Sequence, residues 1–273
     1  MKKENRELSL EEYKKTITRI LKYLDDICKK ENISYSLFAG SLIGAVREGG
    51  IIPWDDDIDI ILDPKNLEKL KRILTKNSNT RYKLLTNDTE ETYYYPHAKM
   101  VDTKTEVEEI GCKQIKGYGA YIDVFCFHNA PDTKLSRIIH FYKIQAYKAI
   151  FSGYAHKVVD KKSKFAHVKK IGKKYAEHTG IRKIINHYNK MISKYDNRPS
   201  KYVICDWPAL SWKKDYQLSS DIKKFKYCKF ENIQASIYKN YDRILTTTFG
   251  DYMTPPDKEK RISKHSMKAI IKE

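Results

Sequence analysis

Apolar residues recur at helical spacing near the start of the chain. A capping sequence begins at Ser9, with Glu12 three residues further on, and predicts a helix over residues 10–30. The apolar positions of this helix are Leu10, Tyr13, Ile17, Ile20, Leu21, Leu24, Ile27 and Cys28. Asp63 and Pro64 mark the start of another helix with a similar apolar face. Both helices are therefore expected to cover a common core.

Short apolar runs predict a sheet between and after these helices. A strand over residues 35–39 and an acidic strand over residues 57–62 flank a Gly-Ser turn and a short helix over residues 42–48. Further short strands are expected near residues 82–86, 97–101, 105–110 and 119–127. Because helices and strands are mixed throughout this half, the pattern predicts an α+β fold in which helices flank a small mixed sheet.

From Lys134 onward the spacing of apolar residues is helical. Two apolar faces, which we expect to serve packing, consist of Leu135, Ile138, Ile139, Tyr142, Ala146, Ala149 and Ile150 and of Ile181, Ile184, Ile185, Tyr188, Met191 and Ile192. Strands are expected to return near residues 202–206 and 226–230. A last helix is expected over residues 238–248, because Gly250 and the Pro255-Pro256 pair oppose its continuation.

Positive charge is concentrated in the helical segment. The chain has a formal net charge of +18, and residues 133–201 contain 18 Lys and Arg against Asp160, Glu177 and Asp196, a local balance of +15. Such a block attracts anionic partners. Nucleic acid, an anionic membrane surface and a polyanionic glycopolymer all fit, although no helix-turn-helix, zinc-finger or RNP pattern accompanies the block. A helical surface that is merely solvated fits as well.

These observations divide the chain into three regions. Residues 1–132 form the expected α+β core, residues 133–201 a basic, mainly helical region for recognition of an acceptor or a membrane surface, and residues 202–273 a C-terminal part that packs back on the core. The five cysteines are odd in number and far apart, which argues against a disulfide framework or a zinc site. With no apolar signal core and no span of membrane length, a cytoplasmic location is expected.

The acidic strand contains the strongest chemical signal. Side chains on a strand alternate between faces, so Asp57 and Asp59 should point the same way, about 7 Å apart at their Cα atoms, while Ile58 and Ile60 enter the core. Mg²⁺ prefers oxygen ligands and is commonly held by one or two carboxylates and substrate phosphates. The layout is that of a metal-dependent phosphoryl or nucleotidyl transfer site.

A solvated acidic loop is the alternative to a metal site. Placing charged aspartates between isoleucines costs several kcal/mol, as an order of magnitude, unless a cation or a hydrogen-bond partner compensates. A strand with this alternation is therefore a poor structural choice without a ligand, which favours the metal site.

The Gly40-Ser41 turn followed by Asp57-Ile58-Asp59 resembles the signature of the nucleotidyltransferase superfamily. The fuller segments resemble the LicD family of phosphocholine transferases, which is related to fukutin. The segments with this resemblance are residues 39–47 with 52–59, residues 95–102 with 120–125, and residues 249–256 with Arg261 and His265. The resemblance implies a nucleotidyltransferase-like catalytic core, a CDP-activated donor and release of CMP.

Spacing and resemblance together assign the catalytic residues. Asp57 and Asp59 are expected to bind one or two Mg²⁺ ions, and Asp123, on a neighbouring strand, is the third carboxylate. Asp123 is expected either to complete a metal site or to take the proton from the attacking hydroxyl. Asp55 and Asp56 precede the strand and are expected to cap it or to bind waters behind the metal.

Phosphate and choline recognition have separate candidates. Gly40 and Ser41 are expected to bring backbone N–H groups to a phosphate, and Arg47 and Lys99 to contact the diphosphate. A choline donor requires aromatic rings, because a quaternary ammonium is held by ring faces. The candidate walls are Trp54, Tyr93, Tyr94, Tyr95, Tyr121, Trp207 and Trp212.

The sequence thus predicts a cytoplasmic Mg²⁺-dependent enzyme, for which peripheral binding to the inner face of the membrane is one option. It is expected to move phosphocholine from CDP-choline to a hydroxyl of a cell-surface glycopolymer precursor of the teichoic acid type, with release of CMP. CDP-ribitol or CDP-glycerol as donor, NMP transfer to a small molecule, and a non-catalytic module that binds RNA or membrane remain alternatives.

Overall fold

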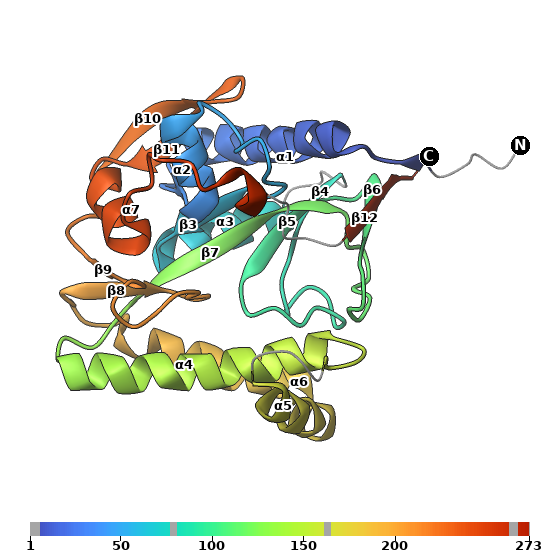
Figure 1. The fold of residues 1–273 in the computed structure, drawn as a ribbon, viewed down its shortest axis with the longest axis vertical. Helices are drawn as coiled ribbons and strands as arrows, with labels where there is room; N and C mark the ends of the chain where they lie inside the picture. Colours follow the sequence, from blue (N-terminus) through green and yellow to red (C-terminus); the bar gives the residue numbers. More distant parts are fainter. Residues whose placement is uncertain (1–5, 77–80, 161–164, 262–266, 273) are drawn as a thin grey trace, which may run out of the picture.

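The computed structural model describes residues 6–76, 81–160, 165–261 and 267–272, and its fold is α+β (Figure 1). His265, one of the residues on which the family resemblance rests, lies outside the described residues. The helices are α1 Leu10–Lys30, α2 Ala39–Arg47, α3 Pro64–Lys76, α4 Lys134–Ala155, α5 Ala166–Thr179, α6 Ile181–Ile192 and α7 Tyr241–Phe249.

A seven-stranded sheet forms the centre of the molecule. Its strands are β2 Ser36–Leu37, β3 Asp59–Leu62, β7 Ala120–Asn129, β5 Ala98–Asp102 and β4 Tyr82–Leu85, in that order, with β8 Tyr202–Cys205 and β9 Tyr216–Leu218 attached at one end of β7. Strand β3 runs parallel to β7, whereas β5 and β8 are antiparallel to it. The long strand β7 therefore joins the core to the C-terminal region.

Two smaller sheets complete the fold. One contains β1 Arg6–Glu7, β12 Met267–Ile271 and β6 Thr105–Glu109, in that order, so the two ends of the described chain lie side by side (Figure 1). The other is the hairpin of β10 Phe225–Phe230 and β11 Ile233–Tyr238.

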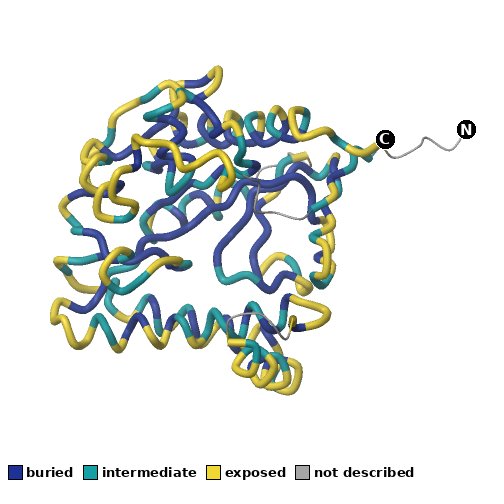
Figure 2. Tube along the Cα trace, viewed as in Figure 1, coloured by how far each residue is buried: buried dark blue, intermediate teal, exposed yellow. Residues whose placement is uncertain are grey.

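Helices cover the central sheet on two sides. Helix α1 begins with the predicted capping box at Ser9 and packs its buried face against β5 and β7. Helices α4, α5 and α6 form a layer beyond the sheet on the side away from α1 (Figure 1). Gly153 and Gly172 allow α4 and α5 to approach closely, since a Cβ on Gly153 would lie 2.1 Å from the carbonyl oxygen of Lys169. Buried residues follow the sheet and the inner faces of these helices (Figure 2).

Most predicted elements are confirmed to within a few residues, and the differences have local causes. The acidic strand begins at Asp59 and not at Asp57, so Asp57 lies in the segment that leads into it. The last helix begins at Tyr241, because Tyr238 ends strand β11 of a hairpin that the sequence reading did not identify. Helix α5 was not predicted as a separate element. None of the described helices has an apolar stretch long enough to cross a membrane.

Candidate active site

Three neighbouring strands bring the predicted catalytic residues together. Asp59 on β3 lies opposite Asp123 on β7, and Asp123 lies opposite Lys99 on β5. Asp57 precedes β3 and is close enough to Asp59 to influence its ionisation. The sheet therefore holds Asp59, Asp123 and Lys99 side by side, with Asp57 at the end of the row.

The two central carboxyl groups have opposite electrostatic surroundings. Burial, followed by the charges of Asp57 and Asp123, raises the pKa of Asp59 well above its ordinary value of 3.8. Burial alone would raise the pKa of Asp123 too, but Lys99 and His97 outweigh it and hold that pKa below the ordinary range. Lys99 Nζ lies 2.6 Å and His97 Nε2 3.0 Å from the same oxygen, Oδ1 of Asp123.

These surroundings fit a cation beside Asp57 and Asp59. Carboxyl groups that repel one another in a buried place are stabilised in their ionised form by a divalent cation, which hard oxygen ligands favour. Asp123, by contrast, is ionised, and its negative charge is already compensated by Lys99 and His97. A carboxylate with a lowered pKa is a weak base. The geometry therefore favours Asp123 as a ligand or an electrostatic group over Asp123 as the proton acceptor.

A carboxylate cluster lies immediately before β3. One side-chain oxygen from each of Asp55, Asp56 and Asp57 falls within 4.8 Å of the others, and Asp56 is buried. Only Asp57 belongs to both this cluster and the row on the sheet. Asp55 and Asp56 therefore extend the set of carboxylate oxygen atoms that could hold a cation beside Asp57.

Asp57 and Asp59 lie in the walls of two neighbouring cavities. One has a volume of about 630 Å³ and contains Lys99, Asp123 and Glu109 in its wall. The other, of about 470 Å³, is bounded by Gly40, Arg47 and several further residues. The residues that line both cavities are Phe38, Ala39, Asp57, Asp59, Trp207 and Ala209. A substrate that spans the two cavities would thus pass directly over Asp57 and Asp59.

The Gly-Ser turn is fixed to the acidic strand. The Ser41 hydroxyl accepts a hydrogen bond of 2.8 Å from the backbone N–H of Asp59, and the N–H of Phe38 donates to the Asp59 carbonyl at 2.9 Å. Ala39, at the start of α2, has a φ of 44°, which is strained for a residue other than glycine. A Cβ on Gly40 would lie 2.9 Å from Asp55 Oδ2. The turn therefore positions the carboxylates directly, besides its expected contact with phosphate.

Arg47 and Trp54 lie together in the second cavity. Arg47 Nε is 2.7 Å from Glu48 Oε1, and its Nη1 donates to the Tyr252 carbonyl at 2.9 Å. The guanidinium groups of Arg47 and Arg261 lie 5.7 and 5.0 Å from the ring centroid of Trp54. Because these cations already face the ring, Trp54 fits recognition of an anionic group better than recognition of choline.

A tyrosine cluster surrounds Lys99 in the first cavity. The Lys99 ammonium lies 3.7, 4.9 and 5.9 Å from the ring centroids of Tyr121, Tyr95 and Tyr118. All three hydroxyl groups donate to the carboxylate of Glu109, at 3.3, 2.7 and 2.6 Å respectively. Lys99 is therefore held between an aromatic cage and Asp123, and the predicted choline wall at Tyr95 already contacts a cation.

Sequence reasoning had not assigned roles to His97, Glu109 or Tyr118. His97 precedes Lys99 by two residues, so strand alternation could have placed both on one face with Asp123 opposite. Glu109 and Tyr118 gave no such signal, because their meeting depends on how β6 and the segment before β7 fold together. Trp207 had been named as a possible wall, and the structure places it in both cavities.

The segment that contains the carboxylate row also matches a known family. Residues 32–151 match the family model described as the LicD/FKTN/FKRP nucleotidyltransferase domain. The chain contains a LicD-family domain. Every predicted catalytic and substrate-binding residue lies within this LicD-family domain, whereas Trp207 lies outside it.

Relatives extend the similarity beyond the domain. The lipopolysaccharide cholinephosphotransferase LicD of Haemophilus influenzae is 28% identical over 280 residues, which cover 97% of this chain and 99% of that protein. Two uncharacterized proteins, from Rickettsia prowazekii and Rickettsia typhi, are 36% and 33% identical over shorter segments that cover 24% and 26% of this chain. The Haemophilus protein is thus similar through the C-terminal region as well as the LicD-family domain.

Proposed function

We propose that this chain is a phosphocholine transferase of the LicD type that uses CDP-choline as donor. The observation that supports this most strongly is the row of Asp59, Asp123 and Lys99 at the junction of two cavities, with Asp57 beside it. The similarity to a lipopolysaccharide cholinephosphotransferase over nearly the whole chain supports the choice of phosphocholine as the transferred group.

In the proposed reaction an acceptor hydroxyl oxygen attacks the phosphorus of the phosphocholine group. The new phosphodiester bond forms while the bond between that phosphorus and the bridging oxygen of CMP breaks. CMP leaves with the electron pair of that bond, and the proton of the acceptor hydroxyl passes to water. Asp57 and Asp59 would hold Mg²⁺, which neutralises charge that develops on the phosphates when it is bound. Asp123 and Lys99 fix the electrostatics of the neighbouring wall, and Gly40 and Arg47 bound the cavity proposed for the anionic nucleotide part.

We propose a cell-surface glycopolymer as the acceptor. Lipopolysaccharide is the acceptor class that the name of the Haemophilus relative gives for that protein, and a teichoic acid precursor is the alternative from the sequence. All five cysteines are free in the structure, which fits a reducing compartment such as the cytoplasm.

Comparison of donors tests the proposal. The purified protein is incubated with Mg²⁺ and, in separate reactions, with CDP-choline, CDP-ribitol, CDP-glycerol and each nucleoside triphosphate. Faster release of CMP from CDP-choline than from the other CDP donors is the expected result. Release of pyrophosphate from a triphosphate would instead support NMP transfer, and binding of none of these compounds would support a non-catalytic module.

A further inference from the structure

Exposed apolar side chains gather on α4, α5 and the segment between them. Ile171 on α5 is 69% exposed and Val158, just after α4, is 80% exposed. The other large apolar side chains exposed here are Leu135, Ile139, Tyr142, Val168 and Tyr175. Isolated exposed apolar residues are ordinary on protein surfaces, but a contiguous group indicates a site of interaction.

The two helices present these side chains as continuous stripes. Val168, Ile171 and Tyr175 follow one another at spacings of three and four residues, so they lie on one face of α5. On α4 the exposed residues share a face with Ile150 and Gly153, where α5 packs. Helix α5 therefore covers one half of this face of α4 and leaves the other half open.

Lysines accompany the apolar stripe. A cavity of about 720 Å³ lies between α5 and residues 157–160, and its wall contains four lysines and two acidic residues together with Val158 and Val159. The charged members are Lys157, Lys170, Lys173, Lys174, Asp160 and Glu177. Lys173 is fixed by hydrogen bonds from its Nζ to the carbonyl oxygens of His156 and Lys157, at 2.9 and 2.6 Å. The surface is thus basic where it is also apolar.

We propose that this surface, formed by α5, residues 157–160 and the first half of α4, docks on an anionic lipid bilayer. Aliphatic side chains gain from burial in the interfacial region of a bilayer, and neighbouring lysines gain from anionic headgroups. A nucleic acid would use the lysines but would leave Val158, Val168 and Ile171 in water. A bilayer is therefore the occupant that uses both properties of the surface.

The position of the surface relates it to the candidate active site. Phe151, Ser152, Ala155 and His156, at the end of α4, line the cavity that contains Asp123. The surface lies on the layer of the molecule away from α1 (Figure 1). Docking would thus hold one wall of the cavity near the lipid headgroups. A lipid-linked acceptor could then reach the cavity from the bilayer surface. The role of the acceptor rests on the proposed function, whereas the docking does not.

Vesicle flotation tests the docking. The intact protein is mixed with vesicles of phosphatidylcholine alone or with about one third phosphatidylglycerol, and its partition coefficient is measured over a salt series. We expect binding to the anionic vesicles that weakens with salt. Lys170→Gln with Lys174→Gln should lower the coefficient about 30-fold, since each lysine near an anionic surface contributes about 1 kcal/mol. Ile171→Ser with Tyr175→Ser should lower it about 10-fold or more.

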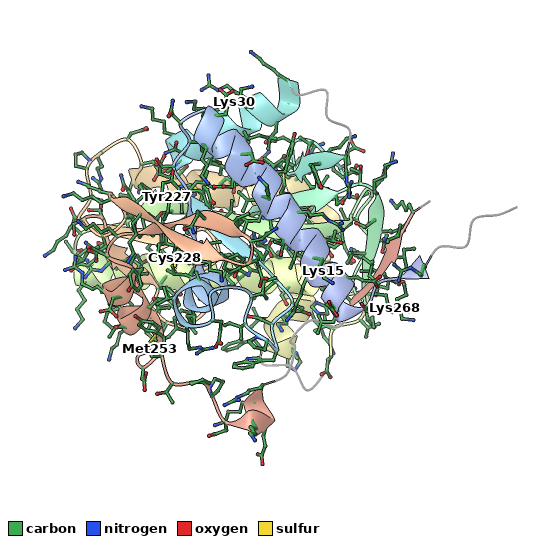
Figure 3. The ribbon with its side chains drawn as sticks, turned by 90° about the horizontal axis from the view of Figure 1, so that it is seen from above. Lys15, Lys30, Tyr227, Cys228, Met253 and Lys268 are labelled. Carbon is green, nitrogen blue, oxygen red and sulfur yellow. The ribbon has the colours of Figure 1, made fainter. Side chains whose placement is uncertain are left out.

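Matched control variants lie on other parts of the molecule. Lys30→Gln with Lys268→Gln removes the same charge, and Tyr227→Ser with Met253→Ser removes exposed apolar groups (Figure 3). Both controls should bind within about twofold of wild type, because the groups that they remove are not part of the proposed surface. Circular dichroism and the melting temperature verify that every variant is folded.

Three results would overturn the docking proposal. The first is equal binding to neutral and anionic vesicles, and the second is an equal loss of binding in the α5 variants and in their controls. The third is that the protein does not bind vesicles but binds single-stranded RNA, and that the α5 variants abolish this RNA binding. Donor binding distinguishes a failure of the docking proposal from a failure of the proposed function. Calorimetry with CDP-choline should give the same affinity in wild type and in the α5 variants. Docking without CDP-choline binding would refute only the proposed donor.

Discussion

Glu109→Gln tests whether the tyrosine cluster holds Lys99 against Asp123. The substitution keeps the size of the side chain but removes its charge and replaces one of its oxygen atoms by an amide nitrogen. That nitrogen donates hydrogen bonds and does not accept them, so Tyr95 loses its acceptor if the nitrogen takes the place of Oε2, and Tyr118 and Tyr121 lose theirs if it takes the place of Oε1. Burial raises the pKa of Tyr95 well above its ordinary value, so its hydroxyl stays protonated and can only act as a neutral hydrogen-bond donor to Glu109.

The size of the effect follows from the bonds that the carboxylate accepts. A hydrogen bond to a charged acceptor contributes about 1.5–3 kcal/mol, and Glu109 is only half-buried, so we expect the free energy of unfolding to fall by about 2 kcal/mol or less. Disturbing the groups that orient ligands of a metal costs about 10- to 100-fold in activity or metal affinity. We expect kcat to fall within that range, with a smaller change in KM for CDP-choline.

The assay measures CMP release and the melting temperature in purified variants. Glu108→Gln is the matched control, because Glu108 precedes Glu109 on β6, is exposed and points to the other face of the strand. The control should retain wild-type kcat and lose less stability. Wild-type kcat in the Glu109→Gln protein, or an equal loss in both proteins, would refute a positioning role for the cluster.

Three further substitutions test the carboxylate row. Asp59→Asn should abolish transfer. Because the pKa of Asp59 is raised above 3.8, its ionised form opposes folding, so the substitution should raise the melting temperature of the metal-free protein at pH 7. This gain should disappear below about pH 4, where the carboxyl group is protonated in both the folded and the unfolded state. Asp123→Asn should lower the free energy of unfolding by about 3 kcal/mol in urea titrations, because Lys99 stays buried without its counterion. Gly40→Ala should reduce kcat but not stability, because its Cβ displaces only the Asp55 side chain. A melting temperature of Asp59→Asn at or below that of wild type, a wild-type free energy of unfolding in Asp123→Asn, or a wild-type kcat in Gly40→Ala would contradict these expectations.

The parts of the fold that sequence predicted are those with local causes. Helix α1 has the predicted bounds, because its capping box and its apolar spacing lie within the helix itself. The acidic strand and the strand of Asp123 were predicted as neighbours, and the register that pairs Asp59 with Asp123 confirms this. The start of α7 was wrong because residues 233–238 pair with β10, and an apolar run of that length fits a strand or a helix.

The site was predicted less completely than the fold. Asp57 and Asp59 could be predicted from the sequence, because charged aspartates that alternate with isoleucines are costly to bury without a cation. The enclosure of Lys99 was not visible, since tyrosines from two segments and Glu109 from a third must meet around it. Many tyrosines in a chain serve packing, so sequence alone does not indicate which of them share one acceptor.

Transfer from doubly labelled CDP-choline tests the central claim most directly. The donor contains ³²P in the phosphate next to choline and ¹⁴C in the choline, and the acceptor is lipopolysaccharide that lacks phosphocholine. Wild-type protein with Mg²⁺ should place both labels on the acceptor in equal amounts and release unlabelled CMP, whereas Asp59→Asn should place neither. Transfer of ¹⁴C without ³²P, or equal transfer by the Asp59→Asn protein, would contradict the account.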